Sequence, residues 1–153
     1  MKRFGVCLLS LLLSLCMLTA CGTADVDLKV VFDDINTQFA ISDLTVIEDA
    51  SKLNRYYMIE EDTVKQFAAE FSAESSVFTE IVLVEAVDET SATEIATLLN
   101  NHYQSRLSEA KSYNPEAVAM LENCSVEQNG AYVSLIIGEN ASEIKAVYDS
   151  YFE

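Results

Sequence analysis

Four consecutive residues near the N-terminus, Leu18-Thr19-Ala20-Cys21, have the types and order that direct a covalent modification. They follow a basic start, Met1-Lys2-Arg3, and an apolar run of 14 residues from Gly5 to Leu18. This run is shorter than the roughly 20 apolar residues that span a bilayer, and it is typical of a signal-peptide core. The pattern predicts a bacterial lipoprotein signal in residues 1–20.

In that signal, Leu18, Thr19 and Ala20 form the recognition site of the signal peptidase, and Cys21 becomes the first residue of the mature protein. The Cys21 thiol takes a diacylglyceryl group through a thioether bond, and its two acyl chains give stable anchoring where one chain gives only marginal binding. The alternative is an ordinary signal peptide in which Cys21 is incidental. Residues 21–25 form a short tether, so we expect the domain to lie close to the extracytoplasmic face of the cell membrane.

Few other residues offer chemistry. The only histidine is His102, expected at the surface or at the edge of a groove, within reach of Ser105 or Glu109. Cys124 is the only cysteine after Cys21, which leaves the mature domain without an internal disulfide, and we expect it to be a buried apolar side chain. We find no motif of a hydrolase, a zinc site or a phosphate-binding loop. The sequence therefore predicts no catalytic residue, no metal site and no cofactor.

Two further groups of residues could bind a ligand. Glu60-Glu61-Asp62 places three acids in a row, but calcium loops space their ligands at alternate positions, so a helix start or a solvated turn is the expected structure. The chain has seven tyrosines and no tryptophan. Tyrosine is favoured at binding surfaces and also fills the edges of cores, and the second role is the one we expect.

The charge is strongly negative. The 153 residues include 9 basic and 25 acidic ones, for a net charge of −16. Loss of residues 1–20 removes Lys2 and Arg3 and no acid, so the mature chain carries −18. Such a domain is repelled by phosphate backbones and by anionic lipid surfaces, which argues against nucleic-acid binding and makes a covalent tether necessary.

The mature chain reads as one acidic α+β domain over residues 26–153. Apolar spacing predicts helices over 26–39, 92–113, 115–122 and 140–152, capped by Asp25 or Asp27, Ser91, Asn114 and Asn140. Residues 40–62 are irregular, with a short extended part and one or two helical turns at 50–57. Strands are expected at 65–73, 78–87 and 131–137, and Asn129-Gly130 indicates a hairpin turn before the last of these. Two hairpins would form an antiparallel sheet of about four strands, with the helices mainly on one face.

These segments resemble a family of small bacterial lipoproteins known as domain of unknown function 4358. The resemblance rests on the lipobox, the opening helix, the apolar strand Glu80-Ile81-Val82-Leu83-Val84, the long helix up to Pro115, Gly130-Ala131-Tyr132-Val133 and the last helix. One departure falls at Met58-Ile59-Glu60, where the resemblance implies Gly-Ile-Asp. It implies a surface lipoprotein of Gram-positive type and transfers no functional residue.

The expected role is that of a non-catalytic domain, held at the membrane by the lipid on Cys21, which binds a protein or peptide partner of the cell envelope. The alternative is a solute-binding or accessory lipoprotein, which would need a pocket of roughly 300 Å³ or more lined by the tyrosines.

Overall fold

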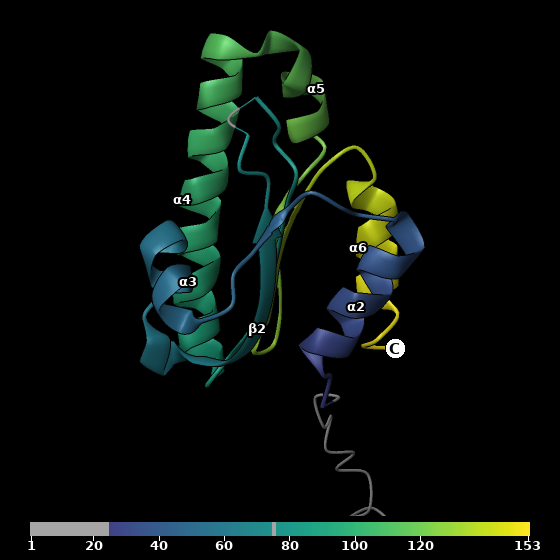
Figure 1. Ribbon diagram of the computed structural model, residues 1–153. Coiled ribbons are helices and arrows are strands. Elements are labelled where there is room, and N and C mark those ends of the chain that lie inside the picture. The colour runs from purple at the N-terminus through teal and green to yellow at the C-terminus, as the bar shows by residue number, and fades with distance from the viewer. Residues whose placement is uncertain (1–24, 75) are drawn as a thin grey trace, which may run out of the picture.

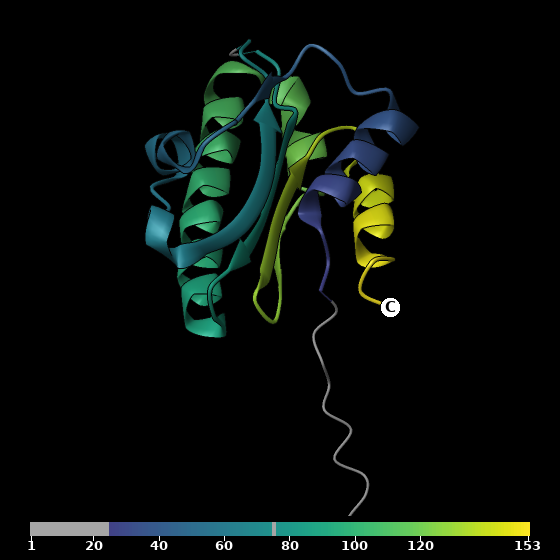
Figure 2. The ribbon, with the colours of Figure 1, turned by 60° about the horizontal axis from the view of Figure 1, so that its bottom comes forward.

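The computed structural model describes residues 25–74 and 76–153, and it shows an antiparallel sheet between two layers of helices (Figures 1 and 2). The strands are β1 (Thr45–Val46), β2 (Val64–Phe71), β3 (Glu80–Ala86), β4 (Val126–Asn129) and β5 (Tyr132–Ile137). They lie in the order β1-β2-β3-β5-β4. The α+β class and both hairpins, β2–β3 and β4–β5, are confirmed. The sheet has a fifth strand, because β1 adds to the edge of β2.

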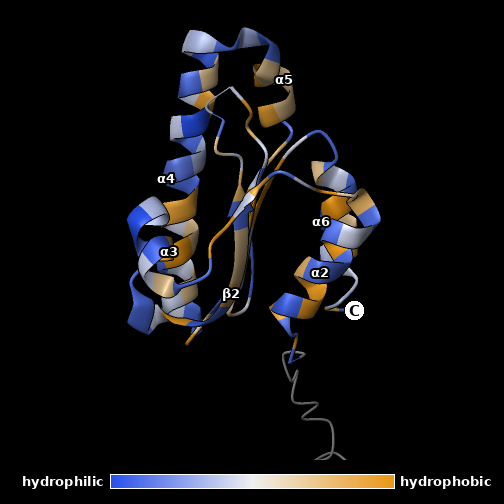
Figure 3. Ribbon diagram, in the orientation of Figure 1, coloured by the Kyte–Doolittle hydropathy of each residue, from blue (hydrophilic) through white to orange (hydrophobic). Residues whose placement is uncertain are grey.

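The helices of the described residues are α2 (Leu28–Phe39), α3 (Ala50–Tyr57), α4 (Glu89–Tyr113), α5 (Val118–Leu121) and α6 (Ala141–Asp149). Short 3₁₀ turns at Glu61–Thr63 and Pro115–Ala117 connect them to their neighbours. None of these helices is long and apolar enough to cross a membrane. The hydrophobic residues of α4 lie toward the sheet and its hydrophilic residues face outward (Figure 3).

The helices cover both faces of the sheet, so the expectation of one covered face is wrong. Helices α3 and α4 pack on one face, and α2 and α6 pack on the other (Figure 2). The reason lies in β3, where all seven residues are buried. Successive side chains of a strand point to opposite faces, so a strand that is apolar on both faces requires cover on both.

Several local signals of the sequence are confirmed, and one predicted cap, Ser91, is wrong. Asp27 caps α2, where its side chain accepts hydrogen bonds from the N–H groups of Lys29 and Val30. Helix α4 begins at Glu89, capped by Asp88, whose carboxylate accepts a 2.7 Å bond from Ser91 N. Ser91 therefore lies in the first turn and is not the cap, because Asp88 is an equally good cap three residues earlier.

Asn114 holds the cap position of the 3₁₀ turn at Pro115, as expected, but without a side-chain capping bond. Its side-chain amide donates to Ser76 O over 3.2 Å. Pro115 does restart the helix, as expected, although as a 3₁₀ turn followed by α5. At the last helix, Asn140 holds the cap position of α6 but makes no side-chain capping bond.

Two turns contain a residue with positive φ, one a glycine and the other a methionine. In the β4–β5 hairpin Asn129 pairs with Tyr132, so the turn residues are Gly130 and Ala131, and Gly130 has φ 58°. At the end of α3, Met58 has φ 63° and is in the left-handed region that glycine adopts without strain. This is the position at which the resemblance implies glycine.

Candidate functional site

The outer edge of β2 is the most open part of the sheet. Strand β1 pairs with β2 only at Thr45↔Phe71 and Val46↔Glu70, and Ile47 N donates a further 2.8 Å bond to Ala69 O. Beyond that bond, residues 64–68 of β2 have no strand on their outer side among the described residues. An uncovered stretch of edge strand offers free N–H and C=O groups to another chain.

The backbone direction identifies the open groups. Ala69 O points toward β1, and the direction of the N–H and C=O groups alternates along a strand, so those of Phe67 point to the same open side. The backbone N–H and C=O groups of Ala68, between them, point toward β3. A bulge between Val64 and Gln66 interrupts this alternation at Lys65, so the regular part of the open edge is centred on Phe67.

A groove of about 670 Å³, here called the edge groove, runs along this stretch. Its walls come from α2 on one face of the sheet and from the segment leading into α3 on the other, and β2 forms its floor. The lining residues are Lys29, Phe32, Val46, Ile47, Glu48, Ala50 and residues 64–69. The small side chains of Ala68 and Ala69 keep the floor open, and Val46 is 49 % exposed at the rim.

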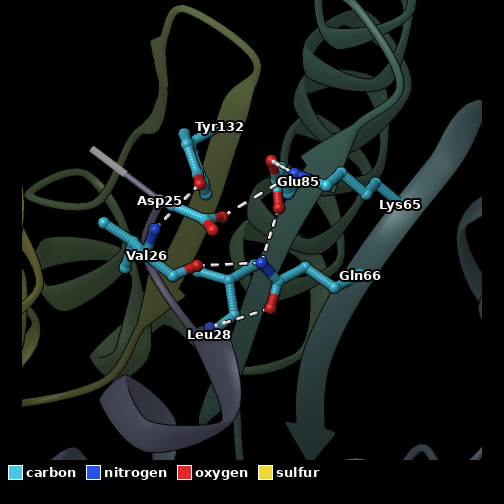
Figure 4. Close-up of polar contacts among 7 residues, drawn as sticks. All are labelled: Asp25, Val26, Leu28, Lys65, Gln66, Glu85 and Tyr132. Atoms are coloured by element: carbon cyan, nitrogen blue, oxygen red, sulfur yellow. Dashed lines mark hydrogen bonds and ion pairs between the residues drawn. The ribbon is translucent and has the colours of Figure 1, made fainter. Parts of the chain in front are cut away.

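A buried polar cluster closes one end of the edge groove (Figure 4). Glu85 is 5 % exposed and accepts hydrogen bonds from Lys65 Nζ at 2.7 Å and from Gln66 Nε2 at 2.5 Å. Burial by itself raises the pKa of Glu85, but the bonds from Lys65 and Gln66 outweigh it and hold that pKa below its usual value. The bond to Glu85 raises the pKa of Lys65. Both residues are therefore charged at neutral pH.

A second polar cluster lies on the other face, against α4. Tyr57 Oη donates a 2.5 Å bond to Glu80, and His102 Nε2 lies 3.0 Å from the same carboxylate. Burial, followed by the charge of Glu80, raises the pKa of Tyr57, so Tyr57 keeps its proton. The partner of His102 is thus Glu80, not Ser105 or Glu109, and Arg106 lies beside it on the wall of a cavity of about 250 Å³.

The other residues considered from sequence take structural positions. Cys124 is 7 % exposed, and its thiol donates to Met120 O, so the expectation of a buried side chain is confirmed. Four of the seven tyrosines are buried, as expected for core edges: Tyr57, Tyr103, Tyr132 and Tyr148. Glu61 and Asp62 begin the 3₁₀ turn before β2. In the described part of the chain, no three acids, histidines or cysteines are placed to hold a metal ion. The lipobox, Leu18 to Cys21, lies outside the described residues.

Sequence reasoning missed the edge groove and both polar clusters. Gln66, Glu80 and Glu85 lie within strands, and nothing in their spacing separates them from solvent-facing polar residues. The one available signal was the position of Glu80 and Glu85 at the two ends of a fully apolar strand, where a polar side chain must be buried.

Taken together, the described residues define a class of α+β domain in which helices cover both faces of an antiparallel sheet and part of the outer side of β2 lies open in a groove. Residues 39–138 match the family described as Domain of unknown function (DUF4358), and the chain belongs to that family. The matched region holds the whole sheet together with α3, α4 and α5, whereas α6 and nearly all of α2 lie outside it. No curated protein and no solved structure matches the chain.

Proposed function

We propose that this protein is a lipid-anchored, extracytoplasmic, non-catalytic domain that binds an extended segment of a partner protein by strand addition along the edge groove. The anchor rests on the lipobox and Cys21. The binding role rests on the open edge of β2, where the backbone of Phe67 faces a groove with walls on both sides. In strand addition, main-chain hydrogen bonds supply affinity and alternate side chains supply specificity.

The shape of the groove supports an extended peptide over a compact solute. It follows the strand for residues 64–69, so a peptide of similar length would place alternate side chains over the two helical layers. Phe32 would contact one set of side chains, and Ile47 and Ala50 the other. A strand held between two walls would bury both sets of alternate side chains, whereas a strand on a flat edge leaves them exposed, and the burial of apolar side chains adds to the affinity.

The negative charge of the domain favours a partner segment with a positive net charge. With a net charge of −18 after residues 1–20, the domain attracts segments of positive net charge and repels nucleic acid. The charged residues that line the groove are Lys29, Lys65 and Glu48, so the lining holds two bases and one acid although the domain as a whole is acidic. A segment with apolar residues at the alternate positions that face Phe32 and basic residues at those that face Glu48 would fit this lining and the negative charge of the domain.

No residue is assigned to catalysis. His102 is bonded to the buried Glu80, and Cys124 lies in a different part of the molecule with its thiol bonded to a backbone carbonyl. Burial raises the pKa of Cys124, which disfavours the reactive thiolate.

A solute-binding or accessory role is the second candidate. A cleft of about 480 Å³ lies at the end of the sheet opposite to the start of α2, between the β2–β3 loop, the turn at Pro115 and the start of α6. It is large enough for a small molecule, but no tyrosine lines it. Tyr56 and Tyr57 line the smaller cavity at Glu80 instead, so the volume and the tyrosines that this role requires occur in different places.

The anchor is tested by Cys21→Ser. This variant should lose labelling by radioactive fatty acid and should leave the membrane fraction. Labelling that persists in Cys21→Ser would show that the lipobox interpretation is wrong.

Strand addition is tested with a decapeptide of alternating valine and lysine, with binding to the chain followed by fluorescence anisotropy. Two versions carry N-methyl groups on alternate residues, on the valines or on the lysines. Only one edge of a bound strand faces β2, so one version should lose at least tenfold in affinity and the other should bind as before. Equal affinities of the two N-methylated versions for the chain would exclude strand addition.

A pair of variants locates the binding edge. Phe67→Pro removes the N–H that faces the groove and leaves the bonds to β3 in place, because Phe67 points away from β3. Phe67→Val, the matched control, keeps the N–H and a strand-forming side chain. Binding should fall in Phe67→Pro and persist in Phe67→Val. Equal affinities in the two variants would place the peptide elsewhere.

A further inference from the structure

The residues that join the tether to the domain are held to the sheet by three hydrogen bonds, which involve the side chains of Gln66 and Tyr132 (Figure 4). Val26 N donates to Tyr132 Oη over 3.1 Å, and Gln66 Nε2 donates to Val26 O over 2.8 Å. Leu28 N donates to Gln66 Oε1 over 3.0 Å. Gln66 is itself held by the buried Glu85, so Gln66, Glu85 and Tyr132 form one unit, here called the polar clamp.

The polar clamp lies at one end of the edge groove. Gln66 contributes both to the clamp and to the lining of the groove, and Lys65 lies beside it. Between Cys21 and Val26 there are five Cα–Cα steps, which span at most about 18 Å. A lipid on Cys21 would therefore keep the Lys65 end of the groove within a few tens of ångströms of the bilayer.

The charge of the domain determines which side turns away from the membrane. At −18, the body of the domain is repelled by an anionic surface, and only the clamped end is pulled toward it. The far end of β3 lies about 20 Å further out, at roughly 3.3 Å per residue. The cleft of about 480 Å³ is at this far end.

We infer that the polar clamp holds the domain end-on at the membrane, so that the edge groove opens beside the bilayer and takes an extended segment that flanks a membrane-embedded protein. This inference rests on the proposed anchor and groove and adds the location of the partner. Without the clamp, residues 26 and 27 would lengthen the tether and the groove would sample a wider range of heights and orientations.

Energy transfer to a labelled lipid headgroup tests the orientation. The lipidated full chain, with Cys124→Ala, is reconstituted into phosphatidylcholine and phosphatidylglycerol vesicles, and a donor is attached to a cysteine placed at Val87 or at Tyr113. Both sites are exposed, at 53 % and 86 %, and they lie at opposite ends of α4. A helix of this length separates them by about 38 Å. Transfer should be several times more efficient from Val87, and equal transfer would overturn the inference.

The clamp is tested by Gln66→Ala, with Gln38→Ala as the matched control on the exposed face of α2. Gln66→Ala should lower the transfer from Val87, and Gln38→Ala should leave it unchanged; equal values would show that the clamp does not set the orientation. Circular dichroism confirms folding, and Tyr132→Phe, which removes only the hydroxyl that Val26 N donates to, replaces Gln66→Ala if that variant does not fold.

The location of the partner is tested with the valine–lysine decapeptide attached to a phospholipid headgroup through a short spacer of two residues or a long spacer of about twenty. A photo-crosslinker at Phe67 should react with the short-spacer peptide at least as well as with the long one. Reaction with the long-spacer peptide alone would overturn the inference and leave strand addition intact. Reaction with neither, together with no binding of the soluble peptide, would instead refute the proposed function.

Discussion

Gln66 and Glu85 face each other across the β2–β3 ladder, and the Gln66 amide donates a 2.5 Å hydrogen bond to the buried Glu85 carboxylate. The same amide binds the carbonyl of Val26, where the chain enters the domain. One side chain thus connects a buried charge, the open edge of the sheet and the tether. The stability of this region should depend on Glu85 remaining ionised.

Glu85→Gln should lower the free energy of unfolding at pH 7 by about 2 kcal/mol, because an amide nitrogen would then face the donors of Lys65 and Gln66. The folded pKa of Glu85 is lowered, so its contribution is present above the unfolded pKa of about 4.3 and is lost as the pH falls through the folded pKa. Urea unfolding at several pH values should therefore show that the difference in free energy of unfolding between the wild-type chain and Glu85→Gln becomes smaller in acid. Glu127→Gln, at a half-exposed ion pair, is the control and should change stability by less than about 1 kcal/mol.

The contribution of Glu70 to stability should depend on pH in the opposite direction to that of Glu85. It is 4 % exposed, and burial raises its pKa. Asn36 Oδ1 and Glu70 Oε1 are buried and have no hydrogen-bond partner among the described residues, while Asn36 Nδ2 donates a long 3.4 Å bond to Glu70 Oε2. A raised folded pKa favours the neutral acid. The contribution of Glu70 to the free energy of unfolding is therefore present below the unfolded pKa and is lost as the pH rises through the folded pKa.

Glu70→Gln should therefore raise the free energy of unfolding at pH 7 by about 1 kcal/mol, because the amide can donate to Asn36 Oδ1. The gain should disappear near pH 4, where Glu70 is protonated. Urea unfolding at both pH values measures it, with Glu116→Gln on the exposed surface as the control. A loss of stability at pH 7 would show that the Glu70 carboxylate is needed in its ionised form.

Met58→Gly should stabilise the protein by about 0.5–1 kcal/mol, because Met58 adopts φ 63° at the end of α3 and is 72 % exposed, so little packing is lost. Asn54→Gly, inside the same helix, is the matched control and should destabilise. Thermal unfolding followed by circular dichroism compares the two. If Met58→Gly lowers the midpoint, the side chain of Met58 contributes more than its exposure indicates.

Asp88→Ala should lower the thermal midpoint, since Asp88 caps α4 and accepts the bond from Ser91 N. Ser91→Ala should leave the midpoint nearly unchanged, because Ser91 lies within the first turn. The two variants separate the observed cap from the one that the Ser91-Ala92-Thr93-Glu94 pattern indicates. A larger effect of Ser91→Ala would favour the later helix start.

The local features of the fold could be predicted because each depends on residues close in sequence. The apolar spacing of Leu28, Val31, Phe32 and Ile35 identified α2, and the run from Ile81 to Val84 identified β3. Pro115 and Gly130 marked a helix restart and a turn through their own backbone preferences. The cap of α4 was missed because Asp88 and Ser91, two residues of similar capping ability, lie three positions apart.

The candidate site could not be predicted in this way, because its contacts join residues that are distant in sequence. Val26 and Tyr132 are 106 positions apart, and Gln66 and Glu85 are 19 apart. Their meeting depends on strand order and register, which place β3 beside β5 and leave β2 near the edge. The sequence by itself determined the secondary structure, the acidic charge and the lipobox motif. Only the tertiary structure decided that both faces of the sheet are covered, that part of β2 stays open and that the tether is clamped at the end of that opening.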